Sequence, residues 1–382
     1  MLHHISNKII IRDSTLREGL QIPGVRISFE DKIRLVHLMD KIGIPEIEIG
    51  IPEGIDASID IAEYIYKNKF SLKTTALVPC YTAGWRQQLD SAARHHFYHV
   101  DIITPTSNFL LRDYELYKIK KLQISSKIKE CIVYAKNLGL DVGVGFIDAT
   151  RSDIDFLLRL TKEASNAGSS RLIIYDTVGI SLPHLIVNLV SQIRKTTDMA
   201  IFMHCHNDYG LATANSLAGF GAGANGIDVS VNGLGGRSGN AALEEVVLAL
   251  ENLYGVNTGI NLSLIKKLSI LTERITGIKC FPLKPIVGDY SFVHIPLMHI
   301  RCVARGHTDT FEPFDPQQVG NERRYAFSLP LDYKRAIEPF LEKLDIHPSE
   351  KKISRILRIL KQKKFSCGLT KNQITNIIKK LT

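Results

Sequence analysis

The chain has 382 residues, of which 45% are hydrophobic and 23% are charged, values typical of a soluble globular protein with a sizeable core. This length exceeds one average domain but suits an α/β barrel of roughly 250 residues with a smaller appendage. No apolar run of about 18 residues and no signal-peptide pattern occur, which disfavours membrane and secreted proteins and predicts a cytoplasmic protein. The six cysteines are dispersed and form no CxxC pair, so we expect reduced thiols.

Eight apolar runs alternate with helical segments through the first two-thirds of the chain. They are rich in Ile and Val, as expected of parallel strands buried on both faces. We predict strands at Lys8–Asp13, Glu46–Gly50, Lys73–Val78, His99–Thr104, Asp141–Phe146, Leu172–Asp176, Ala200–Cys205 and Ile227–Val231. The predicted helices between them include Glu30–Ile42, Gln123–Leu138, Ile154–Ala167 and Leu185–Thr196. Eight such units in series predict an α/β fold, a (β/α)8 TIM barrel over residues 1–275. An open doubly wound sheet is the alternative, although no GxGxxG follows the first strand.

The pattern changes after about residue 275. Residues Phe281–Arg324 are rich in Pro, Gly, His and aromatic side chains and lack periodicity. They predict a linker subdomain, 276–324, over the barrel mouth, followed by a small basic helical subdomain at 325–382.

The last 34 residues carry the positive charge of the chain. From Ser349 to Thr382 there are ten Lys or Arg and one acid, Glu350, which gives +9 and equals the formal net charge of the whole chain. Apolar residues at i, i+3, i+4 and i+7 interleave these charges in two sets: Ile353, Ile356, Leu357 and Leu360, then Ile374, Ile377, Ile378 and Leu381. Two packed helices with solvated basic faces are the favoured interpretation, and a polyanion-binding tail is the alternative. We therefore expect neither nucleic acid nor a membrane as partner.

Polar side chains recur where the predicted strands end, which is where barrel active sites gather. His204 and His206 lie two residues apart on the seventh strand, so both imidazoles share one face. Glu18 follows the first strand, a near neighbour of the seventh in a closed barrel. Two histidines and one carboxylate form a metal site with positions open for substrate or water. Cys205 faces the other way and reads as packing.

Further polar residues at the mouth are candidates for substrate binding. Arg17 is suited to stabilising an enolate or carboxylate oxygen, with an ion pair to Asp13 or Glu48 as the alternative. Thr177 and Arg151 could bind a carboxylate through a hydroxyl and a planar guanidinium, or make structural hydrogen bonds only. Glu48 on the second strand and Asp101 on the fourth are also predicted substrate contacts.

Two long motifs give the chain a family resemblance. Leu16-Arg-Glu-Gly-Leu-Gln21, followed by ten residues and Lys32, resembles the first signature of the homocitrate/isopropylmalate synthase family. The segment from Ile201 to Ala214, around His-Cys-His-Asn-Asp, resembles its second. Similarity continues at Asp176-Thr-Val-Gly179, Asn240-Ala-Ala-Leu-Glu-Glu245 and Phe311-Glu-Pro-Phe-Asp-Pro316, so it spans nearly the whole chain. The nitrogenase-associated type of homocitrate synthase is the most similar in length, since a large regulatory domain is lacking.

The resemblance implies a metal-dependent, Claisen-type condensation of acetyl-CoA with a 2-oxo acid. It implies Glu18, His204 and His206 as ligands of one divalent ion, which could be Zn, Mn, Mg, Co or Fe, with Asn240 close to it. Arg17 and Gln21 would contact substrate near the metal, and Thr177 and Arg151 would hold its carboxylate. In the resembling synthases the region after the barrel crosses to a partner subunit, so the resemblance also implies a homodimer. The two apolar stripes at the end of the chain must be buried against another surface, so we expect the homodimer to form through the C-terminal region.

Several acidic residues of the family pattern are replaced in this chain. Ile147 stands for Glu in Gly-Ala-Glu-Asp-Ala-Ser-Arg, and Gly236 for Glu in Gly-Leu-Gly-Glu-Arg. The motif His-Glu-Ser-Gly-Ile-His becomes His294-Ile-Pro-Leu-Met-His299 and loses a third Glu. Because a histidine titrates near neutrality, we expect His294 or His299 to be the base.

Three functions stay open at this point. Besides condensation, Leu20 and Gly236 resemble the hydroxymethylglutaryl-CoA lyase group, which shares the barrel and the metal set; the cysteine of the lyase loop is missing here. A degenerate paralogue that binds a metabolite without turnover is the third. Which 2-oxo acid is used is also open, with Tyr81, Asp101 and Phe146 as candidates for that choice.

Overall fold

The computed structural model describes residues 9–53, 59–113, 117–329 and 332–382. They form two compact units, Met1–Asn261 with Leu271–Ile278, and Leu262–Ile270 with Lys279–Thr382. Each unit is described by itself. Among the described residues, no helix has the length and apolar character needed to cross a membrane.

The first unit is a closed barrel of eight parallel strands in the order β1 to β8, as predicted. The strands are β1 Ile10–Asp13, β2 Glu46–Glu48, β3 Lys73–Pro79, β4 His99–Pro105, β5 Asp141–Ile147, β6 Arg171–Asp176, β7 Ala200–Cys205 and β8 Gly226–Val229. Each pairs with its neighbour in sequence, and β1 pairs with β8 to close the ring. The eighth strand ends two residues before its predicted end because Val231–Gly233 turns into a 3-10 helix.

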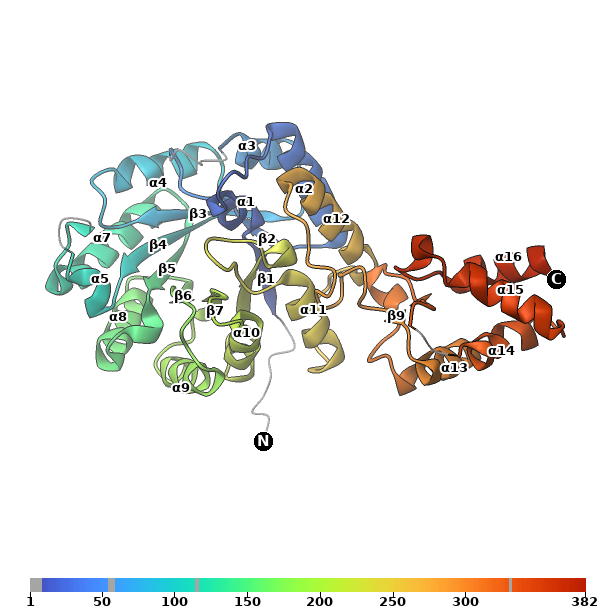
Figure 1. The fold of residues 1–382 in the computed structure, drawn as a ribbon. Coiled ribbons are helices and arrows are strands. Elements are labelled where there is room, and N and C mark those ends of the chain that lie inside the picture. The colour runs from blue at the N-terminus through green and yellow to red at the C-terminus, as the bar shows by residue number, and fades with distance from the viewer. Residues whose placement is uncertain (1–8, 54–58, 114–116, 330–331) are drawn as a thin grey trace. The chain divides into compact units, whose positions relative to one another are not determined.

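Helices surround these strands (Figure 1). They are α1 Thr15–Glu18, α2 Phe29–Ile42, α3 Ile59–Lys67, α4 Trp85–Arg94, α5 Asn108–Leu111, α7 Ile124–Asn137, α8 Ile154–Asn166, α9 Pro183–Arg194, α10 Ala212–Gly221 and α11 Leu243–Asn252. Local sequence sets their ends. Ser28, for example, accepts a hydrogen bond from the backbone N–H of Asp31 at the start of α2, which satisfies one of the free donors of the first turn. The helices α2, α7, α8 and α9 begin and end within two residues of their predicted bounds.

The second unit is helical with one short parallel strand pair, β9 Val293–His294 and β10 Arg324–Tyr325. Its helices are α13 Leu297–Arg305, α14 Lys334–Glu342, α15 Glu350–Leu360 and α16 Lys371–Leu381. Helix α12, Ile265–Thr276, contributes residues to both units. The two amphipathic helices predicted at the end of the chain are therefore present as α15 and α16.

One core holds the second unit together. It includes Ile300 and Val303 of α13, Phe340 of α14, Ile356 of α15 and Ile374 of α16. The segment predicted as an irregular linker thus contributes α13 to the same core as the C-terminal helices. The sequence did not indicate this, because α13 is only nine residues long and the Pro- and Gly-rich stretches around it obscure its helical periodicity.

Candidate metal and substrate site

Three side chains meet at the C-terminal end of the barrel strands. His204 is on β7, His206 directly follows it, and Glu18 ends α1 after β1. One ligand atom from each lies within 4.8 Å of the others. Nε2 of His204 is 3.3 Å and Nε2 of His206 is 4.0 Å from Oε1 of Glu18. All three side chains are buried, so the predicted set forms a compact cluster of nitrogen and oxygen donors.

Unpartnered polar atoms around this cluster fit a cation. Oε2 of Glu18, Nδ1 of His206 and Oδ1 of Asn240 are buried and have no hydrogen-bond partner among the described residues. Asn240 is bridged to His206 through the backbone, and its Nδ2 lies 3.1 Å from Nε2 of His204. Since buried polar groups are normally satisfied, the donor set suits a divalent metal ion.

Asp228 on β8 orients His204 from below. Its Oδ2 accepts a hydrogen bond from Nδ1 of His204 at 3.0 Å, which directs Nε2 toward Glu18. Burial alone would lower the pKa of His204, but the hydrogen bonds to Asp228 and Glu18 raise it to about 9. Metal binding must displace that proton from Nε2, while the Nδ1 proton stays on the bond to Asp228. This is the carboxylate–histidine arrangement that tunes many metal sites.

The substitution Asp228→Asn is expected to weaken metal binding by roughly 10–100-fold, because a neutral amide supports the imidazole less than a carboxylate does. Competition with a chromophoric chelator would measure the affinity. Asp141→Asn is the matched control: Asp141 lies 2.8 Å from Nδ1 of another barrel histidine, His99, which is not one of the three proposed ligands Glu18, His204 and His206. Equal affinities for Asp228→Asn and the unmodified chain would contradict this role.

Arg17 lies beside the metal set and is held by two carboxylates. Its Nη1 is 2.6 Å from Oε1 of Glu18, and its Nε donates to Oε1 of Glu48. Burial opposes ionisation of Glu18, yet the charge of Arg17 keeps the pKa of that carboxyl well below its usual range. Nη2 of Arg17 is buried and has no partner among the described residues. It is thus a charged donor ready for an oxygen of a ligand.

The loops after β5 and β6 carry the predicted carboxylate-binding residues. The hydroxyl of Thr177 accepts the backbone N–H of Asp148 at 2.8 Å and keeps its own proton to donate. Nε and Nη2 of Arg151 are bonded to Asp148 at 2.7–3.0 Å. Thr177 and Arg151 therefore make structural hydrogen bonds, which was the alternative role expected for them. Only their remaining donors are left for substrate.

Gln21 lies next to the position where the family's glutamate is lost. A Cβ atom at Gly236 would come within 2.8 Å of Oε1 of Gln21. A side chain at this position would therefore require Gln21 to move. The space of the missing carboxylate is bordered by an exposed amide.

Asp101 belongs to a buried ion-pair network rather than to the mouth. Its side chain is fully buried and accepts from Nη1 of Arg12, which also binds Asp228 through Nε and Nη2 at 2.7 Å. Glu46 accepts from Nη1 of Arg171 at 2.7 Å in the same network. Asp101 therefore leaves the set of proposed substrate contacts, because its carboxylate already has a structural partner.

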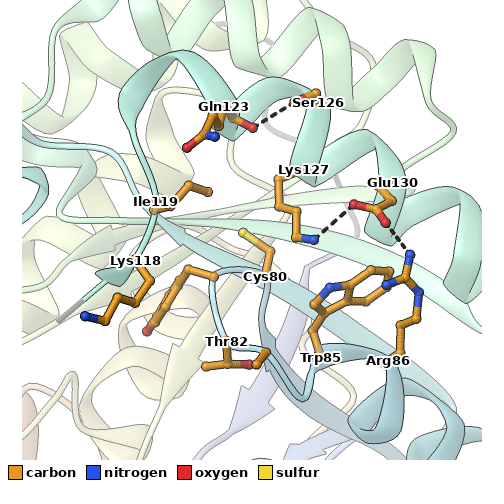
Figure 2. A pocket seen from close by; sticks show the side chains of 12 residues that line it. Cys80, Thr82, Trp85, Arg86, Lys118, Ile119, Gln123, Ser126, Lys127 and Glu130 are labelled. Atoms are coloured by element: carbon orange, nitrogen blue, oxygen red, sulfur yellow. Dashed lines mark hydrogen bonds and ion pairs between the residues drawn. The ribbon is translucent and has the colours of Figure 1, made fainter. Parts of the chain in front are cut away.

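Two further candidates for substrate choice also lie away from the metal set. Side chains alternate along β5, and the interior positions Gly145 and Ile147 flank Phe146, which points outward. Tyr81 lines a separate cavity of about 680 Å3 between the loop after β3 and α7. None of the residues that line this cavity belongs to the metal set; Figure 2 shows the cavity, with Cys80 and Trp85 among the labelled residues. Lys127 and Arg86 both pair with Glu130 in that cavity.

His294 and His299 belong to the second unit. Nε2 of His294 is 2.9 Å from Oε1 of Glu312, and Nε of Arg323 donates to the same oxygen at 2.6 Å. The His299 ring stacks on Phe311 with centroids 3.8 Å apart. His294 is buried within its unit while His299 is half-buried. The catalytic role of both histidines stays a prediction.

Sequence reasoning missed three buried residues of the barrel interior: Arg12, Asp228 and Tyr175. A charged residue inside each of the apolar runs around Arg12 and Asp228 was the available signal. Tyr175 precedes the Asp176-Thr-Val-Gly motif and faces the interior, where its ring centroid lies 4.7 Å from that of His204.

Comparisons with known proteins show the family to which the chain is similar. Residues 8–271 match the protein-family model described as HMGL-like. A homocitrate synthase of Methanopyrus kandleri is 34% identical, over 94% of this chain and 88% of its own length. A 2-isopropylmalate synthase of Sulfolobus acidocaldarius is 36% identical, over 93% and 91%. Homocitrate synthase 1 of a Nostoc strain is 33% identical, over 98% and 97%. Homocitrate and isopropylmalate synthases are thus matched about equally, and the similarity singles out neither.

Solved structures of lyases share the fold. The hydroxymethylglutaryl-CoA lyase of Pseudomonas aeruginosa superimposes with a TM-score of 0.63 at 19% identity, over 73% of this chain and 96% of its own. The HMG-CoA lyase of Brucella melitensis gives a TM-score of 0.62 at 20% identity, over 71% and 99%. At this identity the likeness concerns the barrel fold alone. Over a quarter of this chain lies outside each match.

Proposed function

Because this chain belongs to the HMGL-like family, we propose that it is a metal-dependent acyltransferase that condenses acetyl-CoA with a 2-oxo acid. The relatives that this chain matches over most of their own length are homocitrate and 2-isopropylmalate synthases. The observation that carries the proposal is the cluster of Glu18, His204 and His206 with the unpartnered Nη2 of Arg17 beside it.

The residues of the first unit divide the binding of the 2-oxo acid among them. Glu18, His204 and His206 would hold the divalent ion, with Asn240 as the neighbouring polar side chain, and the ion would polarise the keto group as a Lewis acid. Arg17 donates a hydrogen bond from Nη2 to the oxygen that becomes an alkoxide. Glu48 holds the guanidinium of Arg17 in place. Thr177, Arg151 and Gln21 complete the contacts, with the substrate carboxylate facing Thr177.

The reaction forms one carbon–carbon bond and releases CoA. A base takes a proton from the methyl group of acetyl-CoA, and the resulting enolate attacks the keto carbon of the 2-oxo acid. Water then cleaves the thioester, which yields free CoA thiol and a second carboxylate. The ion is Zn, Mn, Mg, Co or Fe, since this ligand set accepts each of them.

The base is proposed to be His294 or His299. Replacing the base by alanine should lower turnover by about 100-fold or more, the usual effect of losing a general base, without changing metal content. Steady-state kinetics on His294→Ala and His299→Ala would measure this. Phe311→Leu, which removes only the ring stacked on His299, is the control. Full turnover in both histidine variants would assign the base to the barrel.

We further propose that the second unit mediates homodimerisation. The apolar stripes of α15 and α16 do not support this, because they are used in the core of their own unit. The support comes from large apolar side chains exposed elsewhere in the unit, namely Phe281, Leu283 and Met298, each more than half exposed, since such surface commonly marks an interface.

Removal of residues 279–382 should leave a folded barrel that is monomeric and inactive. This cut removes the second unit except for Leu262–Ile270, whereas a cut before Tyr325 would divide the core shared by α13 and α14. Light scattering would measure the mass and far-UV circular dichroism the fold. A truncated chain that remains dimeric and fully active would contradict the proposed role.

The function itself is tested by following thiol release from acetyl-CoA with a panel of 2-oxo acids. Release that depends on both the 2-oxo acid and the metal supports the proposal. Cleavage of a 3-hydroxy-3-methylacyl-CoA without condensation would instead assign the reaction of the lyase group, whose sequence motifs also have Leu20 and Gly236. Metal-dependent binding of a 2-oxo acid with neither reaction would identify a non-condensing paralogue.

A further inference from the structure

One side of the barrel interior is apolar at the level of the metal set. Leu77 of β3, Ile103 of β4, Ile147 of β5 and Tyr175 of β6 form this surface, called here the interior wall, and belong to one cluster. The metal ligands come from β7 and from the segment after β1, so strands β3 to β5 face them across the ring. A 2-oxo acid chelated at the metal set would direct its side chain toward the interior wall.

Tyr175 joins the interior wall to the metal set. It is the register partner of His204 on the neighbouring strand, and its ring packs closely on Gly145, where a Cβ atom would lie 2.7 Å from Cε2. Its hydroxyl is buried without a hydrogen-bond partner among the described residues. A tyrosine hydroxyl can donate one hydrogen bond, and this donor is therefore left for a ligand.

A second carboxylate on the substrate would find poor conditions at this place. The buried guanidiniums of Arg12 and Arg171 are already paired with Asp101, Asp228 and Glu46. Two donors of Arg151 are used by Asp148. A carboxylate placed against Leu77, Ile103 and Ile147 would lose its hydration without gaining a cation.

We propose that the interior wall selects 2-oxo acids with an apolar side chain and no second carboxylate, and that the hydroxyl of Tyr175 binds an oxygen that all these acids share. The apolar atoms of the wall contact the side chain of the substrate, and the phenol donates to a substrate oxygen beside His204. This inference rests on the proposed function for its site, but concerns which 2-oxo acid that site accepts. It names Ile147 as a specificity-determining residue and Tyr175 as a substrate-binding residue.

Binding can be measured apart from the reaction. Isothermal titration of the full-length chain with Mn2+, without acetyl-CoA, would compare 2-oxoisovalerate, 2-oxoglutarate and pyruvate. We expect 2-oxoisovalerate to bind at least about 100-fold more tightly than 2-oxoglutarate, because the second carboxylate of 2-oxoglutarate would be buried without a cation or hydrogen-bond donors. Pyruvate should bind at least about 10-fold more weakly than 2-oxoisovalerate, because it lacks the methyl groups that contact the wall.

Two substitutions separate the parts of the wall. Tyr175→Phe should weaken the binding of all three acids by about tenfold while preserving their order. Ile147→Arg should reduce the preference for 2-oxoisovalerate over 2-oxoglutarate by at least about tenfold, and Ile147→Val is its matched control. Thermal melting of each variant with Mn2+ would show that the fold and the metal site persist.

The outcomes distinguish this inference from the proposed function. Tighter binding of 2-oxoglutarate than of 2-oxoisovalerate overturns the inference. It is also overturned if none of the three acids binds to the Mn2+-loaded chain. Unchanged affinities in Tyr175→Phe overturn the role of the phenol. Selective binding of 2-oxoisovalerate without thiol release would refute the condensation and leave the selectivity standing.

Discussion

Replacing His204 and His206 together by alanine is expected to remove the bound metal and abolish condensation. The two imidazoles supply two of the three ligands, and a single remaining carboxylate on Glu18 cannot compete with water for the ion. A metal that polarises a carbonyl contributes several kcal/mol to the transition state, so turnover should fall at least about a thousandfold. Elemental analysis would report metal per chain, and thiol release would report turnover.

The control for this experiment lies between the two histidines. Cys205 is on the same strand but points away from the metal set and is buried, so Cys205→Ala perturbs β7 without touching a ligand. It should keep one ion per chain and most of the turnover. If the double histidine variant retained the metal content of the unmodified chain, the proposed ligand set would be refuted.

The barrel was predictable because its signals are local. Parallel strands buried on both faces have near-continuous apolar sequences, and β7 lies at its predicted bounds. The proximity of His204 and His206 followed from the alternation of side chains along that strand. Glu18 could be joined to them because β1 and β8 close the ring, a property of the fold class.

Depth inside the barrel was not predictable in the same way. Asp101 and Tyr175 both face the interior, but only the register between strands reveals that Asp101 lies in the layer of Arg12 and Tyr175 in that of His204. Arg12 and Asp228 are 216 residues apart in sequence. Their bond exists only once the first and last strands are neighbours. A single sequence does not specify such pairings.

The apolar stripes of the C-terminal helices show the same difference between local signals, which a sequence reveals, and long-range pairing, which it does not. Helical spacing correctly assigned the stripes of α15 and α16, and buried members such as Ile356 and Ile374 lie in the core of the second unit. It could not tell whether these stripes met each other or a partner, because either arrangement buries the same side chains. The packing of α13 into this core removes the stripes as an argument for association.

Arg12→Met is expected to lower the free energy of unfolding by about 3–5 kcal/mol at pH 8, the usual effect of removing one partner of a buried ion pair. Arg12 is fully buried, binds Asp228 and Asp101, and lies 3.6–3.7 Å from Glu48 and Glu46. Although burial opposes ionisation of Asp228, the charge of Arg12 holds the pKa of that carboxyl below its usual range. Without Arg12, Asp228 is a buried acid facing fewer cations, so its folded-state pKa should rise above that of the unfolded chain.

The pH dependence identifies this cause. An acid with a raised folded-state pKa destabilises the fold at high pH, and the penalty disappears as the pH falls and the acid takes up a proton. Chemical denaturation of Arg12→Met should therefore show a smaller deficit relative to the unmodified chain at pH 5.5 than at pH 8. Arg12→Lys keeps the charge but not the planar double contact with Asp228, and should recover part of the loss at pH 8. A deficit of the same size at both pH values would mean that lost packing, rather than the uncompensated carboxylates, destabilises the barrel.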